Sequence, residues 1–180
     1  MTYGSIKVNN ITYDNNGADV DVAVSSLTSA SSLLPLSGGT LTGNLIAKNG
    51  VDIHRIVEGV SENSATPTNS FELDVNGEVI KYYTGNLTSN FNLNIRGDAT
   101  TTFDSLLSAG EALTCVLVVT NGATGYFNTG VTIDGASTLV YWNGGAPTSA
   151  TANCITAYTF TVIKRATNTY IVLASLANFE

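Results

Sequence analysis

Apolar and polar residues alternate strictly along much of the C-terminal part of the chain. Phe71, Leu73 and Val75 alternate with Glu72 and Asp74. A period of two places successive side chains on opposite faces of an extended strand, so that one face can be buried. The pattern recurs between short runs of Gly and Asn, which favour turns. It therefore predicts short β-strands and argues against a helical protein.

Further strand signals follow the first one. Residues 91–96 repeat the alternation, and residues 115–119 form a continuous apolar run, as expected of a central strand. Asn76-Gly77 is a two-residue hairpin signal between the first strand and the next. Residues 164–168 have the composition of the loop of a final hairpin. Short strands at this spacing predict an all-β protein with a β-sandwich, jelly-roll-like head over residues 66–180.

The composition narrows the class of protein. The chain has 180 residues and a formal net charge of -7, and only 12% of its residues are charged, about half the usual share of roughly 25%. Nucleic-acid binding is disfavoured, because no basic patch is present to neutralise phosphates. No apolar run approaches the roughly 18 residues that a membrane-spanning helix needs. We therefore expect that the protein neither binds nucleic acid nor inserts into a membrane.

The first 65 residues have a different character. They contain no Phe and no Trp, and small polar residues dominate residues 25–32. Brief apolar alternations flank the turn signal Asn15-Asn16-Gly17, and such short strands are marginal in water when isolated. We expect residues 1–32 to be an extended attachment segment that pairs with neighbouring chains or a docking partner. Residues 33–65 are then a short neck and linker.

The segment from residue 34 to residue 45 reads LPLSGGTLTGNL. It resembles the LPLSGGTMTG-x-L segment that recurs in bacteriophage tail fibres and related virion appendages, with Leu41 where that family often has Met. Pro35 favours an extended conformation at the residue before it. Gly38-Gly39 permits a tight turn or a close approach to the axis of a symmetric assembly. Residues 4–9 and 84–180 are also similar in style to small virion proteins of marine and cyanobacterial phages.

The resemblance implies an intertwined fibre neck, in which three chains wrap together and their leucine side chains fill the shared axis. The neck residues would be Leu34, Leu36, Gly38, Gly39, Leu41, Gly43 and Leu45. The resemblance further implies a homotrimeric virion structural protein, a tail fibre or similar appendage that meets neighbouring virion proteins through its N-terminal segment. A capsid-decorating fibre or head protein would have the same neck and head. A plain Gly-rich hairpin between domains is the competing interpretation of the segment.

The sequence shows no recognisable catalytic set. His54 is the single histidine and has no Ser-His-Asp arrangement around it, and no nucleotide-binding glycine motif is present. The carboxylate pairs Asp19/Asp21 and Glu72/Asp74 have a spacing that a polysaccharide hydrolase could use. Both pairs alternate with apolar residues, so the solvated face of a strand is the far commoner explanation. We therefore predict no enzyme and no cofactor, with a small hydrolase as the alternative.

Metal binding and disulfide formation are also disfavoured. Asp and Asn residues between positions 14 and 21 offer oxygen ligands suited to Ca²⁺. Their spacing is not that of an EF-hand loop, and turn chemistry explains them, so we predict no metal. Cys115 and Cys154 could form one disulfide, but two reduced cysteines buried in strands are the expectation.

Aromatic residues near turns of the C-terminal part are candidate glycan contacts. Exposed aromatic rings beside amide groups can stack on sugars and bind their hydroxyls, although buried core aromatics look the same in a sequence. The candidates are Tyr126, Tyr141, Trp142 and Asn143. A host-surface glycan is thus a candidate partner, and a soluble carbohydrate-binding module is a further alternative function.

Overall fold

The computed structural model describes residues 10–15, 18–23, 56–65 and 69–180. The chain divides into two compact units, Met1–His54 and Arg55–Glu180. In the first unit, β1 (Asn10–Asn15) and β2 (Ala18–Ala23) pair with each other in antiparallel fashion. The predicted turn signal therefore lies between two strands of one hairpin. Pairing of this segment with other chains stays a prediction.

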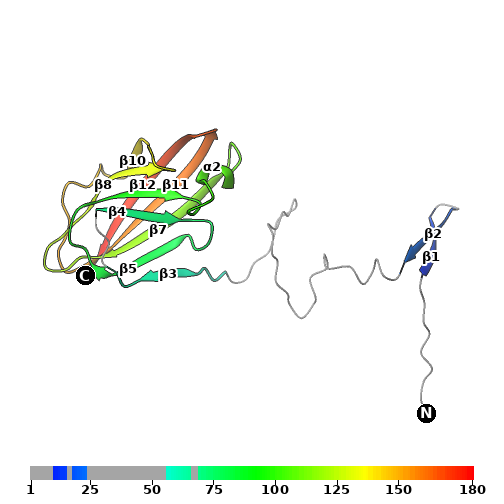
Figure 1. Cartoon of the computed structure of the whole chain (residues 1–180), viewed down its shortest axis with the longest axis horizontal. Helices are drawn as coiled ribbons and strands as arrows, with labels where there is room; N and C mark the ends of the chain where they lie inside the picture. Colours follow the sequence, from blue (N-terminus) through cyan, green and yellow to red (C-terminus); the bar gives the residue numbers. More distant parts are fainter. Residues whose placement is uncertain (1–9, 16–17, 24–55, 66–68) are drawn as a thin grey trace, which may run out of the picture. The chain divides into compact units, whose positions relative to one another are not determined.

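The described residues of the second unit form two β-sheets and one helical turn, α2 (Phe103–Leu106) (Figure 1). The six-stranded sheet has the order β10 (Val140–Trp142), β12 (Thr169–Phe179), β11 (Ile155–Ala166), β7 (Ala112–Thr120), β5 (Ile80–Asn86) and β3 (Val60–Asn63). The four-stranded sheet has the order β4 (Ser70–Asp74), β6 (Phe91–Arg96), β8 (Asn128–Ile133) and β9 (Ala136–Ser137). The all-β prediction is confirmed.

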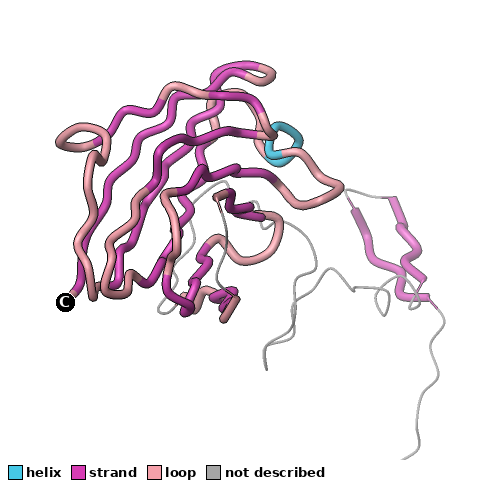
Figure 2. Tube along the Cα trace, turned by 60° about the vertical axis from the view of Figure 1, so that its left-hand side comes forward, coloured by secondary structure: helices cyan, strands magenta, loops and turns pink. Residues whose placement is uncertain are grey.

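The chain winds back and forth between these two sheets. From β3 to β8, consecutive strands lie in alternate sheets, and each strand is parallel to the strand two places further on. Parallel neighbours need a crossover, because a two-residue turn cannot join them. The long hairpin β11–β12 then adds to β7 in antiparallel fashion, with its turn between Ala166 and Thr169. Figure 2 shows these strands running alongside one another, and the predicted final hairpin is confirmed.

The hairpin predicted at Asn76-Gly77 is wrong, because β4 and β5 lie in different sheets. After β4 the backbone stays bonded to the end of β6. The amide of Val75 donates to the carbonyl of Arg96 at 3.0 Å, and the amide of Asn76 donates to that of Gly97 at 2.8 Å. The Asn76 side chain also donates to Asp98 Oδ2 at 2.7 Å. These bonds hold Asn76 beside the end of β6, and the chain then crosses to the other sheet instead of turning back in a hairpin.

One hydrophobic core lies between the two sheets. Phe71 of β4 meets Tyr83 of β5 edge-on, with 4.8 Å between ring centroids, and Phe91 of β6 meets Tyr158 of β11 at 5.7 Å. Phe71 and Phe91 are each only 1% exposed. Burial of one such side chain stabilises a fold by roughly 1.5–3 kcal/mol. The inward positions expected from the alternation at 71–75 and 91–95 are therefore confirmed.

Strand β3 lies within residues 33–65, which the sequence assigns to the neck and linker. It pairs with β5 over four residue pairs, from Val60–Ile80 to Asn63–Tyr83. This part of the segment is therefore an edge strand of the six-stranded sheet. The predicted limits of the three regions otherwise stay predictions.

Candidate functional site

The predicted fibre neck lies outside the described residues. This holds for Leu34, Leu36, Gly38, Gly39, Leu41, Gly43 and Leu45, and also for His54. Asp19 and Asp21 lie in β2. The candidate sites that can be located in space are therefore the aromatic residues and the second carboxylate pair.

The four candidate glycan contacts do not form one continuous set. Trp142 points inward and packs edge-on against Tyr158 and Phe160, with centroid distances of 6.3 and 5.8 Å. Its neighbour Tyr141 points the opposite way and is 56% exposed. Tyr126 is partly buried against the core, and its amide donates to Asn121 Oδ1 at 2.9 Å.

Trp142 nevertheless lines an open hollow, which we call the Trp142 groove. The groove has a volume of about 220 Å³ and is shared with Asn128, Thr129, Thr138 and Pro147. Thr138 also borders a second hollow of about 460 Å³ lined by Leu139, Asn168 and Tyr170, among others. An aromatic side chain beside hydroxyl and amide groups is a chemistry that suits a sugar. The sequence did not reveal Asn128 or Thr138 as partners, because Asn128 comes from β8 and Thr138 from the loop between β9 and β10.

Asn143 takes part in this region through its backbone. Its amide donates to the carbonyl of Ala174 in β12 at 2.8 Å, and its side chain is exposed. Gly144 and Gly145 follow with positive φ angles of 79° and 99°, a conformation that glycine adopts without strain. The turn that directly follows Trp142 in the chain therefore holds the end of β10 against β12.

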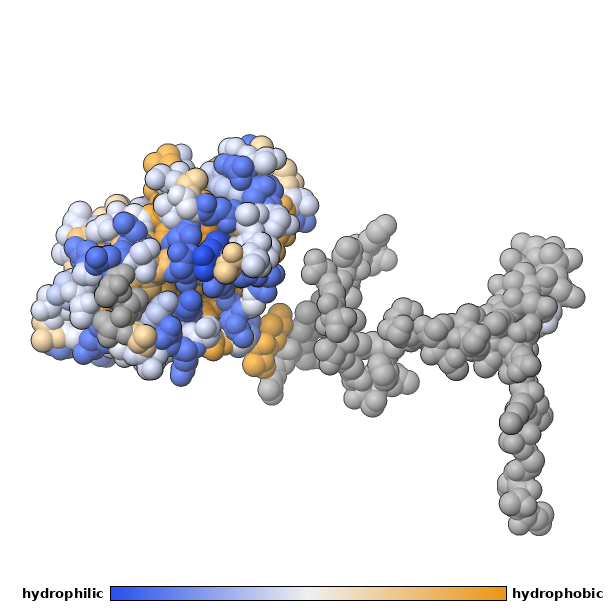
Figure 3. Space-filling view, viewed as in Figure 1, coloured by the Kyte–Doolittle hydropathy of each residue, from blue (hydrophilic) through white to orange (hydrophobic). Residues whose placement is uncertain are grey.

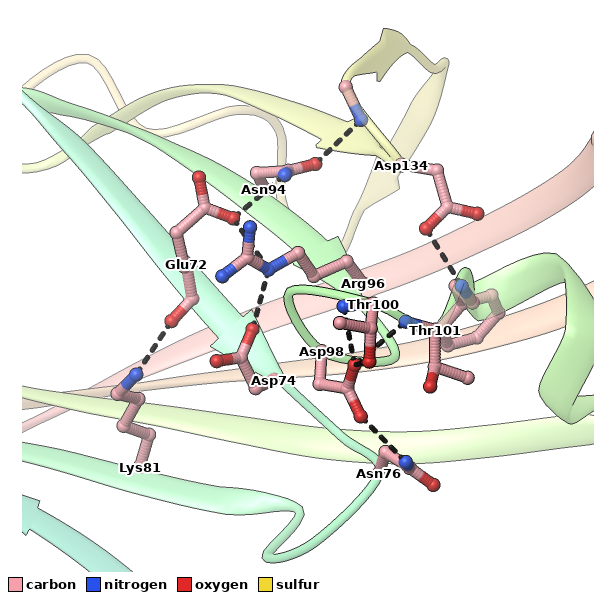
Figure 4. Close-up of polar contacts among 12 residues, drawn as sticks. Glu72, Asp74, Asn76, Lys81, Asn94, Arg96, Asp98, Thr100, Thr101 and Asp134 are labelled. Carbon is pink, nitrogen blue, oxygen red and sulfur yellow. Dashed lines mark hydrogen bonds and ion pairs between the residues drawn. The ribbon is translucent and has the colours of Figure 1, made fainter.

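The second carboxylate pair lies on the outward side of the four-stranded sheet, which we call the polar face (Figure 4). Arg96 Nε lies 2.6 Å from Asp74 Oδ1 and 3.1 Å from Glu72 Oε2. The hydrogen bond to Asp74 raises the pKa of the Arg96 guanidinium above its ordinary value. Asn94 Nδ2 also donates to Glu72 Oε2, at 2.8 Å. Ion pairs this exposed contribute on the order of 0–1 kcal/mol.

The polar face continues into a turn organised by Asp98. Its Oδ1 accepts from the amides of Thr100 and Thr101, each at 2.7 Å, and its Oδ2 accepts from Asn76. The bond from the Asn76 side chain, followed by those from Thr100, holds the pKa of Asp98 well below its usual range. Arg96, Asp98 and Asp134 border a shallow hollow of about 290 Å³. Each of these side chains already has protein partners.

A buried polar cluster that sequence reasoning missed ties α2 to the last hairpin. Lys164, whose side chain is only 9% exposed, pairs with Asp104 Oδ1 at 3.0 Å and donates to the carbonyl of Leu107 at 3.0 Å. Asp104 also accepts from the amide of Asn168 and the hydroxyl of Tyr170. The bond from Asn168, then that from Lys164, lowers the pKa of Asp104. Burial, reinforced by Asp104, raises the pKa of Tyr170.

Both cysteines are free and buried, as the sequence led us to expect. Cys115 lies in β7 with no exposed surface, and burial raises the pKa of its thiol to about 12. Cys154 directly precedes β11 and is 4% exposed. A thiol that is buried and neutral reacts slowly with alkylating reagents.

Within residues 10–15, 18–23, 56–65 and 69–180, no group of three or more His, Cys, Asp or Glu side chains gathers as metal ligands would. In the same part of the chain, no helix is both long and apolar enough to cross a membrane.

Comparison of the chain with protein-family models, with curated proteins and with solved structures gives no match.

Proposed function

We propose that this chain is a structural protein of a bacteriophage virion, a trimeric tail fibre or similar appendage that presents its C-terminal unit for adhesion. The observation that carries the proposal is the fibre-type segment of residues 34–45, which precedes a compact all-β unit in the chain. An extended neck that shares its leucines among three chains, followed by a rigid head, suits a mechanical and adhesive role.

Within this proposal the head is a β-sandwich, with two sheets that enclose the core described above. A jelly roll is built from antiparallel strands, whereas β3 to β8 pair in parallel. We therefore propose a sandwich whose strands are wound as a coil and closed by the β11–β12 hairpin. Such a head is stiff, because each turn of the coil is bonded to the next.

The test of the proposal is the mass of the full chain in solution, measured by light scattering. A trimer has three times the chain mass of 18.7 kDa. Replacement of Leu41 and Leu45 by Asp places charges on the shared axis, so the double variant should dissociate while the circular dichroism of the head stays unchanged. A variant that remains trimeric would remove the neck from the explanation. Identification of the virion protein that the full chain binds separates a tail fibre from a capsid decoration.

Glycan binding by the head is a second candidate function, favoured by the Trp142 groove. We expect full-length protein to bind a subset of sugars on a glycan array and Trp142→Phe to weaken that binding, because a smaller ring offers less stacking surface. Tyr141→Phe is the matched control, since Tyr141 is the adjacent aromatic on the opposite side of the sheet. Equal binding by both variants would exclude the groove as the glycan site.

A further inference from the structure

The outward side of the six-stranded sheet, which we call the outer face, is apolar. In β7, Cys115, Leu117 and Val119 are buried, so Val116 and Val118 point away from the core. The strand register extends this face in both directions from β7. Representative apolar residues, from one edge of the sheet to the other, are Val60, Ile80, Val116, Ala157, Leu173 and Tyr141.

Large side chains on the outer face are open to solvent in the single chain. Val60 is 49% exposed, Leu173 45%, Tyr141 56% and Phe179 59%. Single exposed apolar residues are normal, but a contiguous apolar surface marks an interaction site. Between them lie small uncharged residues, and Thr114 and Thr161 satisfy each other's hydroxyls at 2.9 Å. The outer face therefore carries exposed apolar side chains among small uncharged ones.

The two sheets of the unit contrast sharply in charge. The polar face of the four-stranded sheet carries the network of Glu72, Asp74 and Arg96 (Figure 4). Among the described strand residues of the six-stranded sheet, the charged residues at outward positions are Glu62 in the edge strand β3 and Arg165 beside the hairpin turn. The surface turned to the viewer in Figure 3 shows hydrophilic residues with hydrophobic ones between them. One sheet is thus built to face water, and the other is not.

Charge and size favour a second copy of the chain as the occupant of the outer face. Each chain carries a net charge of -7, so copies repel least where they meet through an uncharged surface. The strand lengths, at about 4.8 Å between strands and about 3.3 Å per residue, give the face an area of roughly 700 Å². A standard stable interface buries roughly 800 Å² per partner.

We propose that copies of this chain pack against one another through the outer face of the six-stranded sheet. This inference rests on the trimer proposed above and gives its heads a contact separate from the neck. Each head would then turn its outer face toward the axis of the assembly and leave the polar face toward solvent. Burial of the exposed apolar side chains on this face stabilises the assembly at roughly 25 cal/mol per Å² of apolar area removed from water.

The test is cysteine labelling of the full chain under native conditions. Leu173→Cys places a thiol on the outer face at a position that is 45% exposed in the single chain. Ala136→Cys, on exposed β9 of the other sheet, is the matched control, and the native cysteines are silent because both are buried. Under native conditions we expect maleimide to label position 173 about tenfold or more slowly than position 136. In urea the native cysteines become reactive in both variants alike, and the two variants should label at equal rates. Light scattering on the same samples gives the mass.

The outcomes separate this inference from the proposed function. A trimer with slow labelling at position 173 supports the outer-face contact. A trimer with equal rates at both positions overturns it and leaves the trimeric appendage standing, whereas a monomer with equal rates overturns both. Thr159→Cys, at the centre of the face, is the second probe in case Leu173→Cys itself weakens packing. Equal labelling of all three thiols in a trimer rejects the outer face.

Discussion

Lys164 shows how one buried cation can organise a loop. Its ammonium group bridges the backbone carbonyls of Asp104 and Leu107 and the Asp104 carboxylate. Lys164→Met keeps the aliphatic length but removes the donor, which leaves buried acceptors without a partner. We expect the free energy of unfolding to fall by about 1–3 kcal/mol, measured by urea denaturation. Arg165→Met, at the exposed next position, is the control, and an equal loss in both variants would contradict this role.

Two aspartates should make the fold sensitive to acid. The folded-state pKa values of Asp98 and Asp104 lie below the ordinary value of 3.8 because both carboxylates accept several hydrogen bonds. A carboxyl group whose pKa is lowered in the folded state stabilises the fold at pH values above its ordinary pKa. This contribution is lost as the pH falls through the folded-state pKa. We expect the free energy of unfolding to fall as the pH is lowered below about 4. Asp98→Asn should show a shallower fall in urea titrations, and identical slopes would refute the assignment.

For single residues, the sequence predicts which side chains are buried better than it predicts which side chains contact one another. The alternation of Phe71, Leu73 and Val75 with carboxylates marks the buried face directly. The bond between Lys164 and Asp104 joins residues 60 positions apart, and no local pattern signals it. Trp142 is a candidate because of its ring and its turn, but its groove also depends on Asn128 from β8 and on Thr138 from the loop before β10.

At the scale of elements, the turn between β8 and β9 supports the start of α2. Asp134 accepts from the amides of Phe103 and Asp104, at 2.7 and 3.1 Å, and has a positive φ of 50°. Asp134→Ala removes both acceptors and places alanine in the left-handed region. We expect a loss of about 1–3 kcal/mol in unfolding free energy and faster hydrogen exchange at both amides. Asp134→Asn tolerates that φ and keeps one acceptor, so an equal loss in the two variants would argue against capping.

Strand positions were more predictable than strand pairing. Period-two patterns indicate which side of a strand faces the core, and β4 and β6 follow them. The continuous apolar run of β7 indicates a strand but not its buried side. They do not state which strand lies alongside. Asn76-Gly77 carries a hairpin signal, yet the bond from Asn76 to Asp98 draws this turn toward β6. The final hairpin was predictable because its two strands are adjacent in the chain and need no crossing.

At the scale of the whole molecule, the outer face became recognisable only with the register. Residues 115–119 read as a central strand, and the register places Val116 and Val118 on its outward side, beside Ile80 and Tyr82. The sequence cannot distinguish a strand buried between two layers from one whose second face awaits a partner chain. The sequence of a chain that assembles through an apolar face therefore contains more core-like apolar residues than the chain buries by itself.

The salt dependence of assembly follows from the same features. Each copy carries a net charge of -7, and the outward positions of the described strands in the six-stranded sheet hold only two charged residues, Glu62 and Arg165. Repulsion between acidic copies then opposes association over a distance that shrinks from about 30 Å at 0.01 M salt to about 8 Å at 0.15 M. We expect the concentration at which the proposed trimer dissociates to fall as sodium chloride is raised, measured by light scattering on a dilution series. A trimer that salt takes apart would instead be held by ion pairs, which would point to a different surface of the chain.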